Sequence, residues 1–245
     1  MIKTILRSLL VAAAVLTRLP VPPIEGFSAE EKGRSLAWFP VIGALMGLIL
    51  AAIAWRLEHV EPVLASVILL TLWMFVSELH HLDSLARSIS AWFFGEMCAG
   101  KQDNSSQHPS VPHLGVMGVM ALVMMVKFAA LSVLIEYKVW PYIFFAPLIA
   151  RLLVIALLGF TPVAANEGVM QEFRVEFPYV ALFVWLLLAV PIALVAGMPM
   201  FAMFVTLILI RFRLKRICGG LTWDSIGASI VLLEAVGLFV AALSA

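Results

Sequence analysis

The chain has 245 residues, of which 63% are hydrophobic and 13% are charged. The charged share is about half of the roughly 25% that is typical of a soluble domain, and the mean hydropathy is +1.08. A soluble fold of this size has too little interior to hide so much apolar surface. We therefore expect a single integral-membrane domain over residues 1–245, which excludes a soluble enzyme, a DNA-binding domain and a disordered chain. The net charge of +1 indicates no nucleic-acid partner.

The N-terminal segment, residues 1–19, begins with basic residues and continues into an apolar run, as a signal peptide does. The sequence that follows it, Thr17-Arg18-Leu19-Pro20, is a poor cleavage site. On a helix, Lys3, Arg7 and Arg18 fall within one narrow sector, because spacings of 4 and 11 residues are close to whole turns. This pattern favours an amphipathic helix that lies in the membrane interface, with a true span as the alternative.

The remaining apolar stretches predict about seven membrane spans, since a helix needs about 20 apolar residues to cross the bilayer core. The sixth stretch is short and follows the fifth through Gly197-Met198-Pro199, which indicates a tight helical hairpin. The predicted fold class is therefore all-α, a polytopic transmembrane helical bundle with an interfacial helix at its N-terminus. The two cysteines, Cys98 and Cys218, are far apart in the sequence, and we expect both to be reduced thiols. The predicted spans are 36–55, 62–79, 114–136, 141–160, 177–197, 198–210 and 226–244.

The connections between these spans are long on one side of the membrane and short on the other. Because short cytoplasmic loops collect Lys and Arg, the more basic set is predicted to lie in the cytoplasm. We therefore expect a multi-pass protein of the cell inner (cytoplasmic) membrane with a cytoplasmic active face. Connections 20–35, 80–113, 161–176 and 211–225 hold Lys32, Arg34, Arg87, Lys101, Arg174, Arg211, Arg213, Lys215 and Arg216, whereas the short ones hold Arg56 and Lys138.

A first polar cluster lies where the second predicted span reaches this face. If the helix continues, Glu78 and His81 share one side of it, and Asp83 and Arg87 are spaced to form an ion pair. A carboxylate and an imidazole at this place indicate a metal or phosphate site, since Mg²⁺ prefers oxygen ligands. The alternative is a helix end that carries ordinary interfacial polar groups.

A second polar cluster, Arg211 to Gly227, joins a basic run to Gly219-Gly220, Thr222 and Asp224 directly before an apolar helix. Such a loop exposes backbone N–H groups, and four cations beside it suit a diphosphate. Asp224 or Ser225 is expected to cap the helix. The basic run by itself is also explained as a topology signal.

Two further segments are less informative. The glycines of Pro112 to Gly118 favour close helix packing over a ligand site. The sequence Asn166-Glu167-Gly168 by itself indicates a turn.

Two cations fall inside predicted spans, Lys127 and Arg151. Each costs roughly 2.5–3.5 kcal/mol at the bilayer centre, so such residues normally face a polar cavity or a partner of opposite charge. Lys127 has the alternative of extending its amine toward the interface.

Taken in chain order, these motifs resemble the cobalamin synthase family of adenosylcobinamide-GDP ribazoletransferases over essentially the whole chain. Six short blocks stand in the order of that family on a membrane protein of matching length. The blocks are Thr17 to Pro22; Arg34, Phe39, Pro40, Gly43 and Gly47; His81, Asp83, Leu85 and Ala86; Pro112, His113, Gly115, Gly118 and Lys127; Arg151, Glu167, Gly168 and Phe173; and Lys215, Arg216, Gly219, Gly220, Thr222, Asp224, Gly227, Ala228 and Glu234.

The resemblance implies a phosphoryl-type transfer. The hydroxyl of α-ribazole, or of its 5′-phosphate, would attack adenosylcobinamide-GDP and release GMP in the last steps of cobalamin biosynthesis, with Mg²⁺ as the expected cofactor. The expected partners are these substrates and the lipid bilayer, with a homo-oligomer or other membrane proteins of the cobalamin pathway as further candidates.

Site residues follow from the resemblance combined with the clusters above. Asp83, His81 and Lys127 are the expected catalytic residues, and Asp83 with Glu78 is the expected metal site. The expected substrate-binding residues are Arg18, Arg34, Arg151, Glu167, Lys215, Arg216, Gly219, Gly220, Thr222 and Asp224.

The sequence also departs from the family pattern. Arg87, Ser90, Val111 and Val231 stand where the family carries carboxylates. The alternative is therefore a catalytically degenerate relative that binds a corrinoid or a nucleotide without transferring it. A transporter is a weaker hypothesis, because the chain has no repeat symmetry and no paired broken helices. A lipid alcohol phosphotransferase would need several aspartates beside Asp83.

Overall fold

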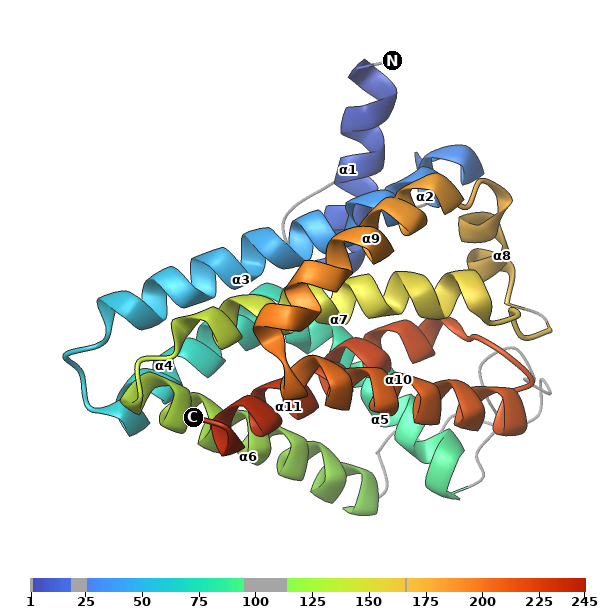
Figure 1. The fold of residues 1–245 in the computed structure, drawn as a ribbon. Helices are drawn as coiled ribbons and strands as arrows, with labels where there is room; N and C mark the ends of the chain where they lie inside the picture. Colours follow the sequence, from blue (N-terminus) through green and yellow to red (C-terminus); the bar gives the residue numbers. More distant parts are fainter. Residues whose placement is uncertain (1, 19–25, 95–113, 166) are drawn as a thin grey trace.

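The computed structural model describes residues 2–18, 26–94, 114–165 and 167–245, without the side chains of Ile2, Lys3, Glu78, His80 and Phe94. Apart from one isolated bridge, every regular element in these ranges is helical (Figure 1), so the predicted all-α membrane bundle is confirmed. The helices are α1 (Ile2–Leu16), α2 (Ala29–Ser35), α3 (Phe39–Arg56), α4 (Pro62–Trp73), α5 (Leu79–Phe94), α6 (Leu114–Glu136), α7 (Trp140–Phe160), α8 (Gly168–Val175), α9 (Tyr179–Ala196), α10 (Met198–Ile217) and α11 (Trp223–Leu243).

Prolines mark where several of these helices begin. Pro40, Pro62, Pro141 and Pro199 lie in the first turns of α3, α4, α7 and α10. Proline suits this position, because its fixed φ is helical and the N–H that it lacks would have no partner within the helix. These local signals set the boundaries of the apolar helices.

All seven predicted spans are helical, but they are not equally suited to cross a membrane. Among the described residues, five helices are long and apolar enough: α2–α3 taken together, α6, α7, α9 and α11. A sixth span would combine α4 and α5, which are bent by 84° around the π-helical segment Met74–Glu78. The predicted hairpin helix, α10, is not in this set, and its last turns carry Arg211, Arg213, Lys215 and Arg216.

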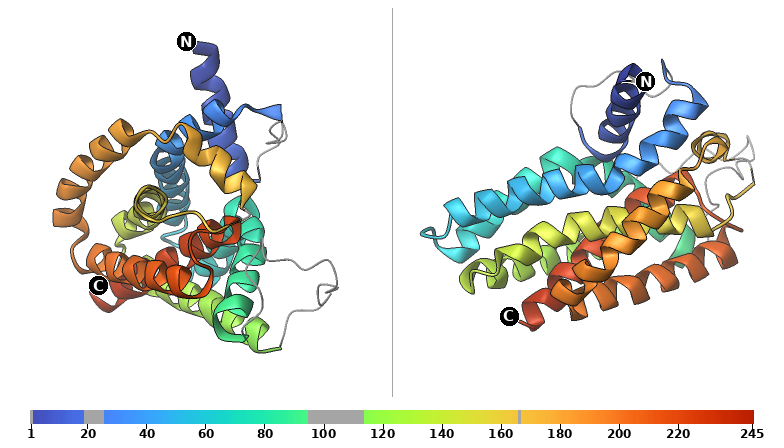
Figure 2. Two further views of the ribbon diagram at one scale, coloured as in Figure 1. Left: turned by 90° about the vertical axis from the view of Figure 1, so that its right-hand side faces the viewer. Right: turned by 45° about the horizontal axis from the view of Figure 1, so that its top comes forward.

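The core is built around α7. Of the most apolar 18 residues of this helix 78% are buried, whereas the corresponding share for α9 is 17%. Two glycines let α3 pack closely on α7. A Cβ at Gly47 would lie 2.3 Å from the Phe144 carbonyl oxygen, and one at Gly43 would lie 2.6 Å from that of Pro147. Seen along the bundle, α7 runs through its middle while α9 stands farther out (Figure 2).

The N-terminal helix α1 projects away from the bundle at its start (Figure 1). Its apolar part, Thr4–Leu16, is shorter than a span, and Val11, Ala12 and Leu16 near its end are fully buried. The predicted position of α1 in the membrane interface remains a prediction.

The two ends of the bundle differ. We call one of them the loop-rich end; it carries α2, α8 and the connections α7–α8 (161–167) and α10–α11 (218–222) (Figure 1). At the other end, the described residues contribute the short α3–α4 and α6–α7 connections, the α9–α10 turn and the C-terminus.

Candidate active site at the loop-rich end

Two connections that are far apart in the sequence pair at the loop-rich end. Val163 and Leu221 form a parallel bridge, in which the Leu221 N–H donates to the Pro162 carbonyl at 2.8 Å and the Ala164 N–H donates to the Leu221 carbonyl at 2.9 Å. Gly220 makes this approach feasible, because a Cβ there would lie 2.5 Å from the Pro162 oxygen. The pairing fixes the α10–α11 connection against the α7–α8 connection.

The Gly219-Gly220 loop begins where α10 ends at Cys218. Gly219 has φ +75°, a conformation that glycine adopts without steric cost. Cys218 is disulfide-bonded in the structure, so the expectation of a reduced thiol at this position is wrong. Cys98 lies outside the described residues.

Two arginines hold the end of α7 beneath this loop pair. Arg174 of α8 donates to the carbonyls of Thr161 at 2.6 Å and Gly159 at 3.3 Å. Arg211 of α10 donates to the Phe160 carbonyl at 2.9 Å. Cations at a helix C-terminus satisfy carbonyls that lack helical partners and oppose the helix dipole. Arg211 therefore has a structural role at the end of α7, and we do not assign it to phosphate binding.

The start of α11 is capped by Thr222, whose side chain accepts from the Ser225 N–H while the Ser225 hydroxyl accepts from the Thr222 N–H. The predicted cap was Asp224 or Ser225, so only the role of Ser225 in the capping box was anticipated. Thr222, predicted to bind substrate, is 4% exposed and has this structural role.

Besides the side chains of Thr222 and Ser225, the Glu167 carboxylate is a hydrogen-bond acceptor at the start of α11. By position it is the N-cap of α8, but its Oε2 instead accepts from the Trp223 N–H of α11 at 3.2 Å. The ring of Trp223 packs on Phe173 of α8, with centroids 5.4 Å apart. The segment that the sequence described only as a turn therefore joins the second predicted cluster.

The Glu167 carboxyl group is almost fully enclosed. The residue is 6% exposed, and its Oε1 has no hydrogen-bond partner among the described residues. Burial raises the pKa of this carboxyl group above its ordinary value; the N–H of Trp223 opposes the shift and the nearby Asp224 carboxylate adds to it. Glu167 is thus biased toward holding a proton.

The first predicted cluster reaches the same place through α5. The Arg87 Nε lies 4.0 Å from the Asp224 Oδ1, and the Arg87 side chain is 66% exposed. The predicted ion pair of Arg87 with Asp83 is not among the ion pairs of the described residues. Arg87 therefore bridges α5 to α11 instead of stabilising α5 alone.

His81 and Asp83 lie on different sides of α5. His81 is 2% exposed and faces α11, where a Cβ at Gly227 would lie 3.0 Å from its Nδ1. Asp83 is exposed. Residues two apart on a helix point in nearly opposite directions, so the two predicted catalytic groups do not converge.

The metal-site prediction rests on Asp83 and Glu78. The side chain of Glu78 lies outside the description, and the described residues include no group of three or more His, Cys, Asp or Glu that would hold a metal ion. The described part of the chain therefore forms no ready-made metal cage, and Mg²⁺ remains a prediction.

The predicted substrate-binding cations outside the core are distributed over three places. Lys215 and Arg216 are exposed in the last turn of α10 and make no ion pair with another described residue. Arg34 pairs with Glu30 at 2.6 Å and with Glu176 at 3.1 Å, which ties α2 to the end of α8. Arg18 is exposed at the end of α1, where its N–H donates to the Val76 carbonyl at 2.9 Å.

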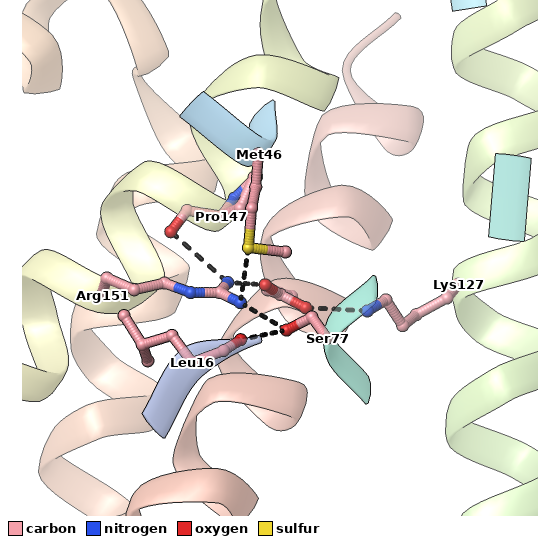
Figure 3. Close-up of polar contacts among 7 residues, drawn as sticks. Leu16, Met46, Ser77, Lys127, Pro147 and Arg151 are labelled. Atoms are coloured by element: carbon pink, nitrogen blue, oxygen red, sulfur yellow. Dashed lines mark hydrogen bonds and ion pairs between the residues drawn. The ribbon is translucent and has the colours of Figure 1, made fainter. Parts of the chain in front are cut away.

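The two membrane cations meet inside the bundle at a carboxylate to which no role had been given (Figure 3). Glu234 of α11 forms ion pairs with Arg151 and, at 2.9 Å, with Lys127. All three side chains have no exposed surface. Arg151 also donates to Ser77 at 3.0 Å, and Ser77 donates to the carbonyl of Leu16 at 3.1 Å, so α1 is connected to the same cluster.

This buried cluster is separate from the loop-rich end. Glu234 follows Asp224 by ten residues on α11, which corresponds to about 15 Å along a helix. Lys127 and Arg151 are thus placed in the core with an acidic partner rather than beside Arg87 and Asp224. The signal for Glu234 was present in the sequence, since it is a carboxylate in a predicted span like the two cations.

Together these features define a class: a polytopic α-helical membrane protein with a polar site at one end of the bundle, where α5, the 161–173 segment and the 218–225 segment meet. The family model described as cobalamin-5-phosphate synthase matches residues 8–242. The chain belongs to the cobalamin-5-phosphate synthase family.

Relatives match along nearly the full length. A protein of Pseudomonas aeruginosa named adenosylcobinamide-GDP ribazoletransferase is 35% identical over 97% of this chain and 98% of its own length. Relatives of the same name from Pseudomonas putida and Stutzerimonas stutzeri are 34% and 32% identical, each over 92% of this chain and 94% of the relative. No solved structure matches the chain.

Proposed function

We propose that this protein is an adenosylcobinamide-GDP ribazoletransferase. It transfers the adenosylcobinamide-phosphate group of adenosylcobinamide-GDP onto α-ribazole, or its 5′-phosphate, and releases GMP. The full-length relatives that carry this name support the proposal. The observation that carries it is the meeting of Arg87, Asp224 and Glu167, from three separate segments, at the loop-rich end.

The residues of this end suit the charge of a diphosphate. Arg87, Lys215 and Arg216 are exposed cations, and a guanidinium can bind two phosphate oxygens at once. In phosphoryl-type transfer, most of the rate enhancement comes from positioning the reactants and from opposing the charge on the phosphates. We assign the first role to the loop pair around Gly219 and the second to these cations.

Mg²⁺ is part of the proposal only as an ion that arrives with the substrate. When bound, it would neutralise charge on the phosphates. The described residues provide no cluster of three ligands, so its proposed contacts are Asp83, Glu78 and the substrate oxygens.

The loop-rich end is proposed to face the cytoplasm of a cell with this protein in its inner membrane, because it carries most of the basic residues. The C-terminus lies at the opposite end of the bundle (Figure 1). A C-terminal alkaline phosphatase fusion should therefore be active, since that enzyme folds only outside the cytoplasm. An inactive fusion would reverse the assigned orientation.

The activity is tested with the purified chain in lipid nanodiscs. We would supply adenosylcobinamide-GDP and α-ribazole, titrate Mg²⁺ from chelator-treated buffer upward, and quantify GMP and cobalamin by chromatography. Equal amounts of GMP and cobalamin are expected. If no GMP forms at any metal concentration, the proposal fails and the non-enzymatic alternative takes its place.

That alternative rested on Arg87, Ser90, Val111 and Val231, and the relatives do not favour it, since they carry the name of the transferase. A homo-oligomer or an assembly with other membrane proteins of the pathway remains part of the proposal. Size-exclusion chromatography with light scattering would determine the oligomeric state.

A further inference from the structure

One side chain at the loop-rich end has a geometry that the proposed substrate-binding role does not explain. Glu167 uses a single oxygen, Oε2, to accept the Trp223 N–H at 3.2 Å. Its Oε1 is buried and has no hydrogen-bond partner among the described residues. A buried polar atom without a partner is costly and uncommon in native proteins, and a catalytic role is one reason for a protein to keep it.

The backbone around Glu167 leaves room for a ligand. Gly168, the next residue, is exposed, and so is Gly219 of the paired loop. A Cβ built on either glycine would meet nothing within 4 Å. The segments on both sides of the carboxyl group therefore border open space, although the group itself is enclosed.

The charged group nearest to Glu167 is negative. Asp224 of α11 is the nearby carboxylate, and the Arg87 Nε from α5 lies 4.0 Å from its Oδ1. The charged side chains of α8 face elsewhere: Glu172 pairs with Lys32, and Arg174 binds the end of α7. On α10, Arg211 is bound to Phe160, and Lys215 and Arg216 are exposed. Glu167 therefore has an anion as its immediate charged neighbour.

We propose that Glu167 is the general base of the transfer and accepts, through Oε1, the proton of the attacking α-ribazole hydroxyl. This inference rests on the proposed function. The hydroxyl oxygen forms a bond to the phosphorus of the cobinamide phosphate while its proton moves to Oε1. The bond from that phosphorus to the oxygen of GMP breaks, and GMP leaves with the electron pair.

The geometry suits this role. The Trp223 N–H fixes the carboxyl group through Oε2, which leaves Oε1 as the oxygen that can take a proton. A base is most effective when its pKa lies near the working pH, and burial beside Asp224 raises the pKa of Glu167 from its ordinary value. Asp83, expected from the sequence as a catalytic residue and metal ligand, is exposed on α5 and lacks such an environment.

The competing explanation is that Glu167 only holds the start of α11. Glu167→Gln separates the two roles, because the amide oxygen still accepts the Trp223 N–H but the amide does not take a proton at neutral pH. Glu167→Asp keeps a carboxylate on a shorter side chain. Glu136→Gln, an exposed glutamate at the end of α6, is the matched control.

The experiment measures steady-state GMP release from pH 5 to pH 9 in nanodiscs, together with thermal unfolding of each variant. For the wild type, kcat should fall as the pH falls through the raised pKa of Glu167. Glu167→Gln should stay folded with a melting temperature at least as high as that of the wild type, lose about 10²- to 10⁴-fold in kcat with little change in KM, and lose the fall in kcat at acidic pH. Glu167→Asp should recover part of the rate and of this pH dependence.

Three outcomes decide against the inference. If Glu167→Gln turns over like the wild type, or is slower but keeps the wild-type fall in kcat at acidic pH, Glu167 is a structural residue and only this inference fails. If the wild type itself releases no GMP, the proposed function fails and the inference with it.

Discussion

Arg151 of α7 and Glu234 of α11 form an ion pair inside the bundle, and neither side chain has any exposed surface. Lys127 of α6 lies on the other oxygen of Glu234, with its amine 4.2 Å from the centre of the Trp73 ring. One carboxylate thus joins three helices through two cations. This arrangement explains how a span tolerates residues that are costly in lipid.

Glu234→Gln should strongly destabilise the protein, because it leaves two buried cations without their charge partner. Removing one member of a buried pair costs about 3–5 kcal/mol. The measurement is the thermal unfolding of the protein in nanodiscs, followed by tryptophan fluorescence. Glu58→Gln is the matched control, since Glu58 of the α3–α4 connection pairs at 3.7 Å with Lys138 of the α6–α7 connection, whose side chain is 59% exposed, and its loss should cost about 0–1 kcal/mol. Equal shifts for both variants would contradict the assigned role of Glu234.

Gly47→Ala should loosen the contact between α3 and α7. The new methyl group would lie 2.3 Å from the Phe144 carbonyl oxygen, so the backbones must separate, at a cost of about 1–3 kcal/mol. Gly118→Ala in α6 is the control, because a Cβ there meets nothing within 4 Å and alanine favours helix by up to about 1 kcal/mol. Urea-dependent unfolding of both variants in mild detergent measures the difference. A Gly118→Ala protein as unstable as Gly47→Ala would argue against a packing effect.

Arg87→Ala should weaken nucleotide binding without affecting folding. Its ion pair with Asp224 is long, at 4.0 Å, and the Arg87 side chain is 66% exposed, so its loss should barely change stability. Loss of a charged hydrogen bond to phosphate costs about 1.5–3 kcal/mol, which is roughly a 10- to 100-fold rise in the Kd for GDP measured by calorimetry. Arg87→Lys should recover part of the affinity. Arg213→Ala, an exposed arginine near the end of α10, should bind like the wild type; a loss of affinity there as large as for Arg87→Ala would mean that only general positive charge matters.

Glu167 should make stability depend on pH. Burial raises its pKa in the folded protein, so the folded state holds this proton more tightly than the unfolded state does. The resulting stabilisation is fully present below the unfolded pKa and is lost as the pH rises through the folded pKa. Relative to Glu167→Gln, the wild type should therefore lose melting temperature as the pH is raised across that interval. If the melting temperatures of the two proteins change with pH in the same way, the pKa of Glu167 is not shifted.

The sequence predicted the helical spans well, because apolar length alone decides whether a segment can cross a bilayer. It predicted α10 less well, since the apolar stretch 198–210 continues as a helix into the basic residues up to Ile217. The cap of α11 was misassigned by a few residues, because Thr222, Asp224 and Ser225 are all suitable cap residues and only the backbone selects among them.

For the site, the sequence identified the segments but not their contacts. Lys127 and Arg151 were each expected to need a partner, and the packing of α6, α7 and α11 selected Glu234 for both. His81 and Asp83 were expected to act together, and the helical geometry of α5 separated them. Glu167 was assigned to substrate without the contact that defines it, the hydrogen bond to Trp223 of another helix.

The sequence by itself determined that this chain is a membrane protein, which segments form apolar helices and which connections are rich in basic residues, because these properties depend on the composition of each segment and its transfer from water to lipid. The tertiary structure decided which charges are neutralised in the core and which remain exposed, and it brought Arg87, Glu167 and Asp224 together. Pairwise electrostatic and hydrogen-bonding energies fall off over a few ångströms, so they depend on contacts between segments that are far apart in the sequence.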